Sequence, residues 1–339
     1  MPDILPLLQC LQPVLSKTQC RQLARIVLAM LAMTGRITQR NIARWTQQGG
    51  SYRSVQRFFQ TSLPWLEIKW RFFACFLYRV QDTYLLVGDE TVCAKAGKKT
   101  FGLDRFFSSV IGKPIPGVAF FGFCLVSVQQ RHAYPLCAEQ VVRTQQEKEQ
   151  AQQRKHKRPA TPKTDKQKKK PGRPKGSKNK NKAQKTLSPE LARILGWAEQ
   201  VLALLQQKMR VRYLVLDGHF GNASACQMTR QLGLHLISKM RHDAALFLQP
   251  TQEQKQAHPR LKYADQLDYA ALPATGLVCS QVEDEVLTQV YQMSCWHKEF
   301  ADLLNIVILK KTDLTTNRVG HVVLFSSDLT LDALMLWDY

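Results

Sequence analysis

Two short apolar segments, each followed by an aspartate, constrain the fold of this chain more than any other feature. The first runs from Tyr84 to Gly88 and leads into Asp89, and the second runs from Tyr213 to Leu216 and leads into Asp217. Short apolar runs that end at a polar residue are typical of buried strands. The chain is therefore expected to contain at least two strands that carry a carboxylate at their ends.

The residues around these segments alternate between strand and helix patterns, which predicts an α/β sheet. Ser188 is placed to cap a helix, Pro189 takes its first position, and apolar residues recur at helical spacing as far as Leu205. Further strands are expected at 118–128, 134–142, 234–240, 282–293, 304–309 and 319–325. Further helices are expected at 223–232 and from 329 onward, the last capped by Asp328 or Thr330.

The first 80 residues show helical patterns. Apolar residues up to Met30 and Leu31 recur at helical spacing, and Phe59 is expected to point inward from a later helix. Ser51 is a candidate cap for a short helix on which Arg53 and Arg57 share one face, and Gly49-Gly50 would form the turn before it. Two short helices around a glycine turn suit a helix-turn-helix that enters the major groove of DNA. A small helical subdomain with a solvated polar face fits the same pattern, and the sequence leaves both interpretations open.

Positive charge is concentrated in one segment. The chain carries a net charge of +22, and the 43 residues from Arg143 to Lys185 hold 17 Lys and Arg against 3 Asp and Glu. Such a segment is too polar to fold alone and favours a polyanionic partner, either nucleic acid or an anionic membrane. Within it, Lys170, Arg173 and Lys175 surround Pro-Gly and Pro in a motif that resembles an AT-hook, which fits a narrow minor groove. A non-specific basic linker is the alternative.

Several classes of protein are excluded by composition. No apolar run approaches the ~18–20 residues that a membrane helix needs, and no signal peptide is visible. The 9 cysteines are scattered without a C-x-x-C pair, so neither a disulfide framework nor a structural zinc site is expected. A reducing cytoplasm is the expected location.

The two aspartates are the candidate catalytic residues. If their strands are neighbours, the carboxylates lie close together at one edge of the sheet, where sites form in α/β folds. Two like charges at that separation repel unless a cation lies between them, and Mg²⁺ or Mn²⁺ prefers such oxygen ligands. Two ions about 4 Å apart would serve phosphodiester chemistry. Alternatively, Asp89 and Asp217 simply open loops.

At these residues the sequence resembles DDE transposases of the bacterial insertion-sequence type. The resemblance rests on Gly88-Asp89-Glu90-Thr91 with the Lys and Gly that follow, on Leu216-Asp217-Gly218-His219-Phe220-Gly221-Asn222, and on Ile237-Ser238-Lys239-Met240-Arg241. It implies an RNase H-like core, Mg²⁺ (or Mn²⁺) at Asp89 and Asp217, and strand nicking and strand transfer at terminal inverted repeats. Double-stranded DNA of the element ends and of the target would be the partner, in the cytoplasm of a bacterium on its nucleoid. Lys95, Lys98, Lys239 and Arg241 lie near the expected site in sequence, where they are candidates to bind DNA phosphates. Solvated surface charges are the alternative.

The sequence departs from that family at its end. The family's third carboxylate is a Glu on a late helix, in a Tyr-x-x-Arg-x-x-x-Glu pattern, whereas this chain ends at Trp337-Asp338-Tyr339. Asp332 or Asp338 could in principle substitute for this Glu, but neither lies in the pattern. We therefore expect a chain truncated before the catalytic Glu, with weak or no activity alone. It would act as a homodimer or pair with a full-length transposase. A non-catalytic DNA-binding remnant and a different RNase H-like nuclease are the alternatives.

These expectations divide the chain into six parts. They are a helix-turn-helix-like domain (1–80), the first part of the catalytic core (81–142), a disordered basic segment (143–187), the second part of the core (188–245), a β-rich insertion (246–325) and the start of a C-terminal helix (326–339).

Overall fold

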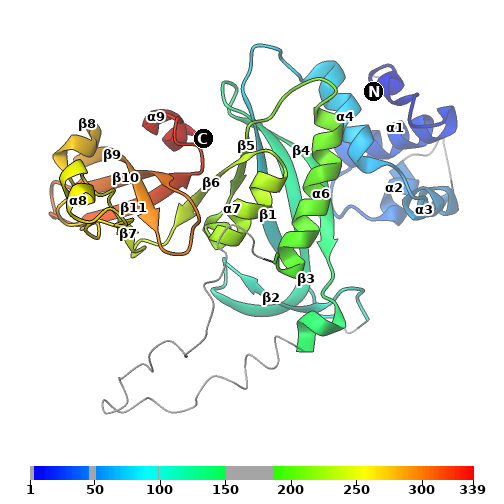
Figure 1. Cartoon of the computed structure of the whole chain (residues 1–339). Helices are drawn as coiled ribbons and strands as arrows, with labels where there is room; N and C mark the ends of the chain where they lie inside the picture. The colour runs from blue at the N-terminus through cyan, green and yellow to red at the C-terminus, as the bar shows by residue number, and fades with distance from the viewer. Residues whose placement is uncertain (1–3, 46–50, 98, 150–185) are drawn as a thin grey trace.

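The computed structural model of the chain describes residues 4–45, 51–97, 99–149 and 186–339. Helices gather at one end, a long twisted sheet runs through the middle, and a β-rich part with α8 and α9 forms the other end (Figure 1). The expected Gly49-Gly50 turn, Lys98 and the AT-hook-like residues Lys170, Arg173 and Lys175 lie outside the described residues.

Helices account for the N-terminal end and cover the sheet. They are α1 (Lys17–Ala32), α2 (Gln39–Trp45), α3 (Tyr52–Gln60), α4 (Trp65–Phe76), α6 (Pro189–Leu205), α7 (Ala223–Gln231), α8 (Gln252–Ala257) and α9 (Ala333–Asp338). The predicted start of α6 is confirmed, because Ser188 Oγ accepts a hydrogen bond from the backbone N–H of Leu191 and Pro189 opens the helix. No helix among these is long and apolar enough to cross a membrane.

The N-terminal helices enclose a small core of their own. Leu23 and Ile26 of α1 pack with Ile42 of α2 and with Val55 and Phe58 of α3. Some residues expected to point inward do not: Leu31 is 76% exposed, and Met30 and Phe59 are also exposed, because the bundle is too thin to cover more than one face of α1 and α3.

Within the described residues eleven strands form one mixed sheet. The strands are β1 (Tyr84–Ala94), β2 (Asp104–Ser108), β3 (Lys113–Ser127), β4 (His132–Val141), β5 (Tyr213–Leu216), β6 (His235–Met240), β7 (Leu246–Phe247), β8 (Leu277–Glu283), β9 (Val286–His297), β10 (Leu304–Asp313) and β11 (Val319–Ser326). The order is β2-β3-β1-β5-β6-β11-β10-β9-β7, with β4 beside β3 and β8 beside β9.

The central strands combine two kinds of pairing. β3 pairs antiparallel with β1 and with β4, and β2 lies between β1 and β3 in the chain, whereas β5 and β6 run parallel to β1. The parallel pairs require crossovers, which α6 and α7 supply before β5 and before β6. The expected α/β architecture is therefore confirmed.

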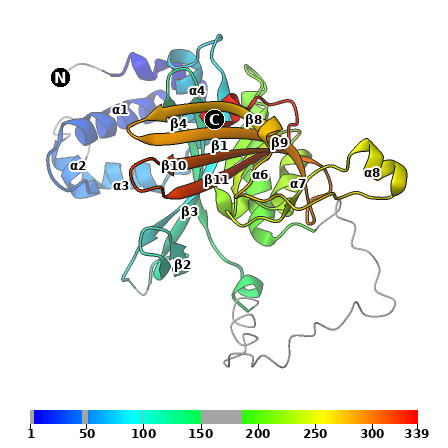
Figure 2. The ribbon, with the colours of Figure 1, turned by 90° about the vertical axis from the view of Figure 1, so that its left-hand side faces the viewer.

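The β-rich part continues this sheet. β11 pairs antiparallel with β6, so the strands after 246 extend the core sheet at its edge. Figure 2 is seen from the side of this β-rich part, with β8, β9, β10 and β11 in front of the core. The single strand expected at 282–293 is wrong: β8 and β9 form a hairpin there. Its two turn residues, Asp284 and Glu285, have φ of 46° and 62°, the left-handed conformation that two-residue hairpin turns require.

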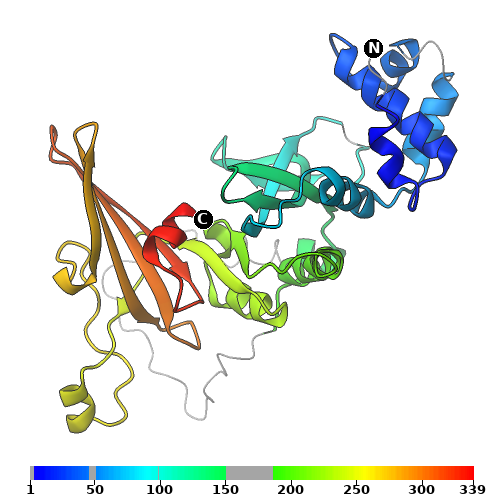
Figure 3. The same cartoon turned by 90° about the horizontal axis from the view of Figure 1, so that it is seen from above.

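The two faces of the sheet are covered differently. On one face α4, α6 and α7 pack on a large core that includes Leu86, Phe121 and Leu214. On the other face α9 and the loop before it pack on Leu85 and Tyr213, in a smaller cluster (Figure 3). Successive residues of a strand point to alternate faces of the sheet. Membership of the larger or the smaller cluster therefore shows which face a strand residue is on.

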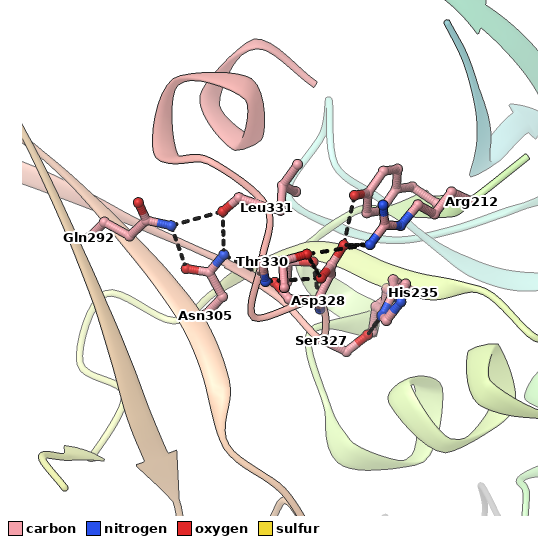
Figure 4. A network of polar contacts seen from close by, with 11 residues as sticks. Arg212, His235, Gln292, Asn305, Ser327, Asp328, Thr330 and Leu331 are labelled. Atoms are coloured by element: carbon pink, nitrogen blue, oxygen red, sulfur yellow. Dashed lines mark hydrogen bonds and ion pairs between the residues drawn. The ribbon is translucent and has the colours of Figure 1, made fainter.

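The last helix begins later than the sequence suggests. Its N-cap is Asp332, whose carboxylate accepts from the backbone N–H groups of Leu334 and Met335, and not Asp328 or Thr330. Asp328 is instead buried and accepts hydrogen bonds from Thr330 and Tyr213 (Figure 4). The expected cap failed because the carboxylate serves a tertiary contact.

Candidate active site

The two predicted aspartates lie side by side. β1 and β5 are adjacent parallel strands in which Gly88 pairs with Leu216, so Asp89 and Asp217 follow at the same level. Neighbouring strands are ~5 Å apart, so the backbones of Asp89 and Asp217 are separated by about that distance. One detail was wrong: β1 does not end at Asp89 but runs on to Ala94, because β3 continues to pair with it.

Both carboxylates point to the same side of the sheet. Val87 and Val215, two residues earlier on each strand, pack in the cluster on the α9 face, so Asp89 and Asp217 share that face. Both residues are exposed, and neither forms an ion pair within the described part of the chain. One oxygen of Asp89 accepts from the backbone N–H of Glu90 at 2.8 Å. The remaining carboxylate oxygens can take a cation.

β6 adds two polar residues at the same level. Its pairing of Ile237 with Val215 places Lys239 beside Asp217 and on the same face. The buried Ser238 points the other way, and its hydroxyl donates 2.8 Å to the backbone carbonyl of Asp217. Asp89, Asp217 and Lys239 therefore form a row across three strands. The Ser238 hydroxyl fixes the backbone of Asp217 from the opposite face of the sheet.

The sequence after Asp217 builds a tight turn that keeps this row together. Gly218–Phe220 form one 3₁₀ turn, and Gly221 then passes so close to β6 that an added Cβ would overlap the carbonyl oxygen of Lys239. Asn222 caps α7, because its side-chain oxygen accepts from the N–H groups of Ser224 and Ala225, each at 3.1 Å. Each of these residue types is required by a contact.

Close packing also requires glycine at position 88 of β1. A Cβ at this position would lie 2.8 Å from Phe121 Cζ and 2.9 Å from Leu216 Cδ2, both in the packed core under α6. Only glycine lets β1 and β5 approach this closely beside the first aspartate.

The opposite face of the same edge carries an ionisable cluster. His219 Nε2 lies 3.6 Å from Glu190 Oε1, and this contact raises the pKa of His219 and lowers that of Glu190. Burial, and then the charge of Glu190, raises the pKa of Glu90. These groups face α6, so they flank the aspartate pair without joining it.

The predicted DNA-binding residues divide into three places. Lys239 lies beside Asp217, and Lys95 is exposed just beyond the end of β1. Arg241 is exposed, but its guanidinium is already paired with Asp243 at 2.9 Å and 3.0 Å. Arg53 and Arg57 are exposed on one face of α3, in the N-terminal bundle.

The acidic residues near the C-terminus have other roles. Asp332 caps α9, and Asp338 forms an ion pair with Arg131 of the β3–β4 turn. Asp328 lies at the opposite edge of the sheet, where it contacts Tyr213 at the start of β5. In the described ranges, no group of three His, Cys, Asp or Glu residues is placed to hold a metal ion.

The comparison with known families agrees with this geometry. A family model described as DDE superfamily endonuclease matches residues 6–300. The chain belongs to this superfamily. No curated protein matches the chain closely enough to add a relative.

The two carboxylates of this DDE-family chain are compatible with that membership. Nucleases of the superfamily use divalent metal ions and act on DNA. The donor set fits such an ion, because Mg²⁺ is commonly bound by one or two carboxylates and by oxygens of the substrate phosphate. A pocket of about 440 Å³ lies beyond the turn that follows Asp217 and is lined by residues that include His219, Arg241 and His297, but neither aspartate is among its lining residues.

Sequence reasoning missed the supporting residues of this DDE-family site. Ser238 was visible only as a hydroxyl inside an apolar strand, and Gly221 only as part of a motif. Their roles depend on contacts between β6 and the turn after β5, which no local pattern shows.

Proposed function

We propose that the chain is a metal-dependent DNA nuclease of the transposase type, with Asp89 and Asp217 as the metal-binding pair. One observation carries the proposal: two exposed carboxylates leave adjacent parallel strands at the same level and on the same face. A bound Mg²⁺ or Mn²⁺ would offset their repulsion and stabilise charge on the reacting phosphate.

The proposed reaction is nicking followed by strand transfer. Oxygen of water, or of a DNA 3′-hydroxyl in the transfer step, attacks the phosphorus and forms a new P–O bond. The bond from phosphorus to the leaving 3′ oxygen breaks, the nucleophile gives up its proton to solvent, and the leaving oxygen takes up a proton from solvent. Lys239 would hold the phosphate through its positive charge, since it shares the level and face of Asp217.

We propose an RNase H-like core for the same chain. The order β4-β3-β1-β5-β6, with three antiparallel strands followed by two parallel ones, supports it. Helices on one face and the late helix α9 on the other agree with a site built at the carboxyl ends of β1 and β5.

Double-stranded DNA, as element ends and as target, is the proposed partner. Lys95, Lys98, Lys239 and Arg241 would contact it near the site. Arg53 and Arg57 would contact it through α3, and the AT-hook-like Lys170, Arg173 and Lys175 through a minor groove. We place this reaction on the nucleoid in the cytoplasm of a bacterium, which agrees with free thiols at all nine cysteines.

We further propose that this chain alone cleaves weakly, because within the described residues no third carboxylate completes a metal site, and that it acts as a homodimer or with another transposase. The two candidates for a third ligand, Asp332 and Asp338, are engaged as a helix cap and in an ion pair with Arg131. This observation also favours the second candidate function, a DNA-binding protein that occupies element ends without cutting them.

A nicking assay tests these proposals. Supercoiled DNA carrying the element ends is incubated with the chain and Mg²⁺ or Mn²⁺, and nicks are mapped by primer extension. Weak cleavage at the ends that disappears in Asp89→Asn and Asp217→Asn supports the nuclease. End binding without metal-dependent nicking supports the second candidate, and efficient cutting of arbitrary DNA indicates a different nuclease.

A further inference from the structure

Three strands run on past the candidate site and form an arm. It consists of the end of β1 (residues 91–94) with Lys95, of β2, of the turn 109–112 and of the start of β3 (residues 113–117). The arm projects from the edge of the sheet at which Asp89 and Asp217 lie, and β2 marks its position at the foot of the core in Figure 1.

One face of the arm is anchored to the core. Phe106 is almost fully buried there, and the guanidinium of Arg143 lies 4.5 Å from the centre of its ring. Arg143 also donates to the carbonyl of Arg105 at 3.1 Å and lies 3.6 Å from the carboxylate of Asp104. These contacts hold the arm in place. Asp104, the one acidic residue among residues 99–117, is thereby paired with Arg143.

The other face of the arm continues the surface of the two aspartates. Asp89 pairs with Gly122 on β3, and counting along β3 in steps of two reaches Pro116 and Pro114 on the same face. Their partners on β2 are Arg105 and Phe107. Both side chains therefore lie on the carboxylate side of the sheet.

This face is open and carries basic and apolar groups together. Phe107 is 61% exposed, and Arg105 is exposed while its Nη2 donates to the carbonyl of Pro114 at 2.8 Å. The turn ends in Val110, which is 94% exposed, and Ile111 is also exposed. Large apolar side chains at an exposed tip beside positive charge are what DNA-binding wedges use against sugars and base steps.

We infer that this face of the arm binds the DNA duplex that extends away from the reacting phosphate, with Arg105 on a backbone phosphate and Phe107 and Val110 against the groove. The inference rests on the proposed function, since it takes the metal-binding pair as the place of cutting. Positive charge favours DNA over a second copy of this basic chain as the occupant.

The register also sets where on the DNA the arm binds. β1 advances six residues from Asp89 to Lys95, which is ~20 Å, and β3 covers ~26 Å between Gly122 and Pro114. At ~3.4 Å per base pair, the arm contacts DNA about 6–8 base pairs from the reacting phosphate.

Charge reversal on the two faces of the arm tests the inference. Arg105→Glu changes the carboxylate face, and Lys113→Glu makes the same change on the opposite face, where its partner is the buried Ser108. Binding of an end fragment is measured by fluorescence anisotropy at several salt concentrations, and hydroxyl-radical footprinting maps contacts. Arg105→Glu should weaken binding about tenfold and lower the salt slope by about 1, whereas Lys113→Glu should change both less. Phe107→Ala should remove protection at about 6–8 base pairs from the nick and leave the rest of the footprint.

Equal effects of the two charge reversals, or an unchanged footprint in Phe107→Ala, would overturn the inference while leaving the nuclease proposal intact. Failure of the unaltered chain to bind or nick end DNA would overturn the proposed function itself. If Phe107→Ala changes the sedimentation coefficient of the free protein and not DNA binding, the face contacts a second copy and the inference is wrong. Thermal unfolding of each variant checks that the arm remains folded.

Discussion

The Tyr213 hydroxyl donates a hydrogen bond of 2.8 Å to the buried carboxylate of Asp328, and this bond joins β5 to the loop before α9. The same carboxylate accepts from the backbone and hydroxyl of Thr330 and lies 2.7 Å from Arg212 Nη2. The connection fixes the late helix to the face that carries the candidate site.

Asp328→Asn should therefore destabilise the chain by about 2 kcal/mol. In the variant an amide NH₂ group, which cannot accept a hydrogen bond, replaces a carboxylate oxygen that accepts one. Tyr213→Phe should cost about 1 kcal/mol, since it removes one of the bonds. The free energy of unfolding is measured with denaturant. Asp302→Asn is the control: Asp302 is exposed and paired with Arg230, so a change near zero is expected. An equal loss in control and test would contradict the role of Asp328.

The contribution of Asp328 should depend on pH in one direction. Burial alone would raise the pKa of Asp328, but hydrogen bonds from Thr330 and Tyr213 outweigh it and lower the pKa from 3.8 to about 2. Because the folded pKa is the lower one, the stabilisation is complete well above pH 4 and is lost as the pH falls from about 4 to 2. The difference in unfolding midpoint between the unaltered chain and Asp328→Asn should be constant from pH 7 to 5 and shrink below 4. A difference that grows on acidification would be inconsistent with this carboxylate.

Gly221→Ala should destabilise the chain by about 1–3 kcal/mol, because the new Cβ overlaps the carbonyl oxygen of Lys239 and the turn after Asp217 must move. Gly196→Ala is the matched control. Gly196 lies inside α6 with no atom within 4 Å of an added Cβ, so alanine should stabilise by about 0.5–1 kcal/mol. Thermal unfolding measures both, and a neutral Gly221→Ala would show that the turn has room to adapt.

Arg53→Gln and Arg57→Gln should each weaken binding to duplex DNA and reduce the salt slope by about 1, because each removes one phosphate contact from α3. Arg21→Gln removes an exposed charge from α1 in the same bundle and should have a smaller effect. Anisotropy titrations at three salt concentrations measure the slopes. If all three variants behave alike, α3 has no special role and the bundle contributes only general charge.

Local patterns predicted the parts of the fold that local chemistry determines. The buried strands before Asp89 and Asp217 and the cap of α6 at Ser188 are all present where expected. The β8–β9 hairpin was missed because its turn uses Asp284 and Glu285, which lack the usual Gly or Asn signal.

Features that depend on distant contacts could not be predicted. Asp328 looks like a helix cap in sequence, but Tyr213, 115 residues earlier, accounts for its burial. Ser238 and Gly221 matter only because β6 lies against the turn after β5. The opposite faces of Phe106 and Phe107 appear only once β2 is registered against β3.

Metal binding by the unaltered full chain tests the central claim most directly. Mn²⁺ is titrated into the chain and into Asp89→Asn, Asp217→Asn and the control Asp302→Asn, and free Mn²⁺ is followed by its electron paramagnetic resonance signal. We expect saturable binding in the unaltered chain and the control, and its loss in both aspartate variants. Equal binding in all four proteins would contradict the assignment of Asp89 and Asp217 as the metal-binding pair.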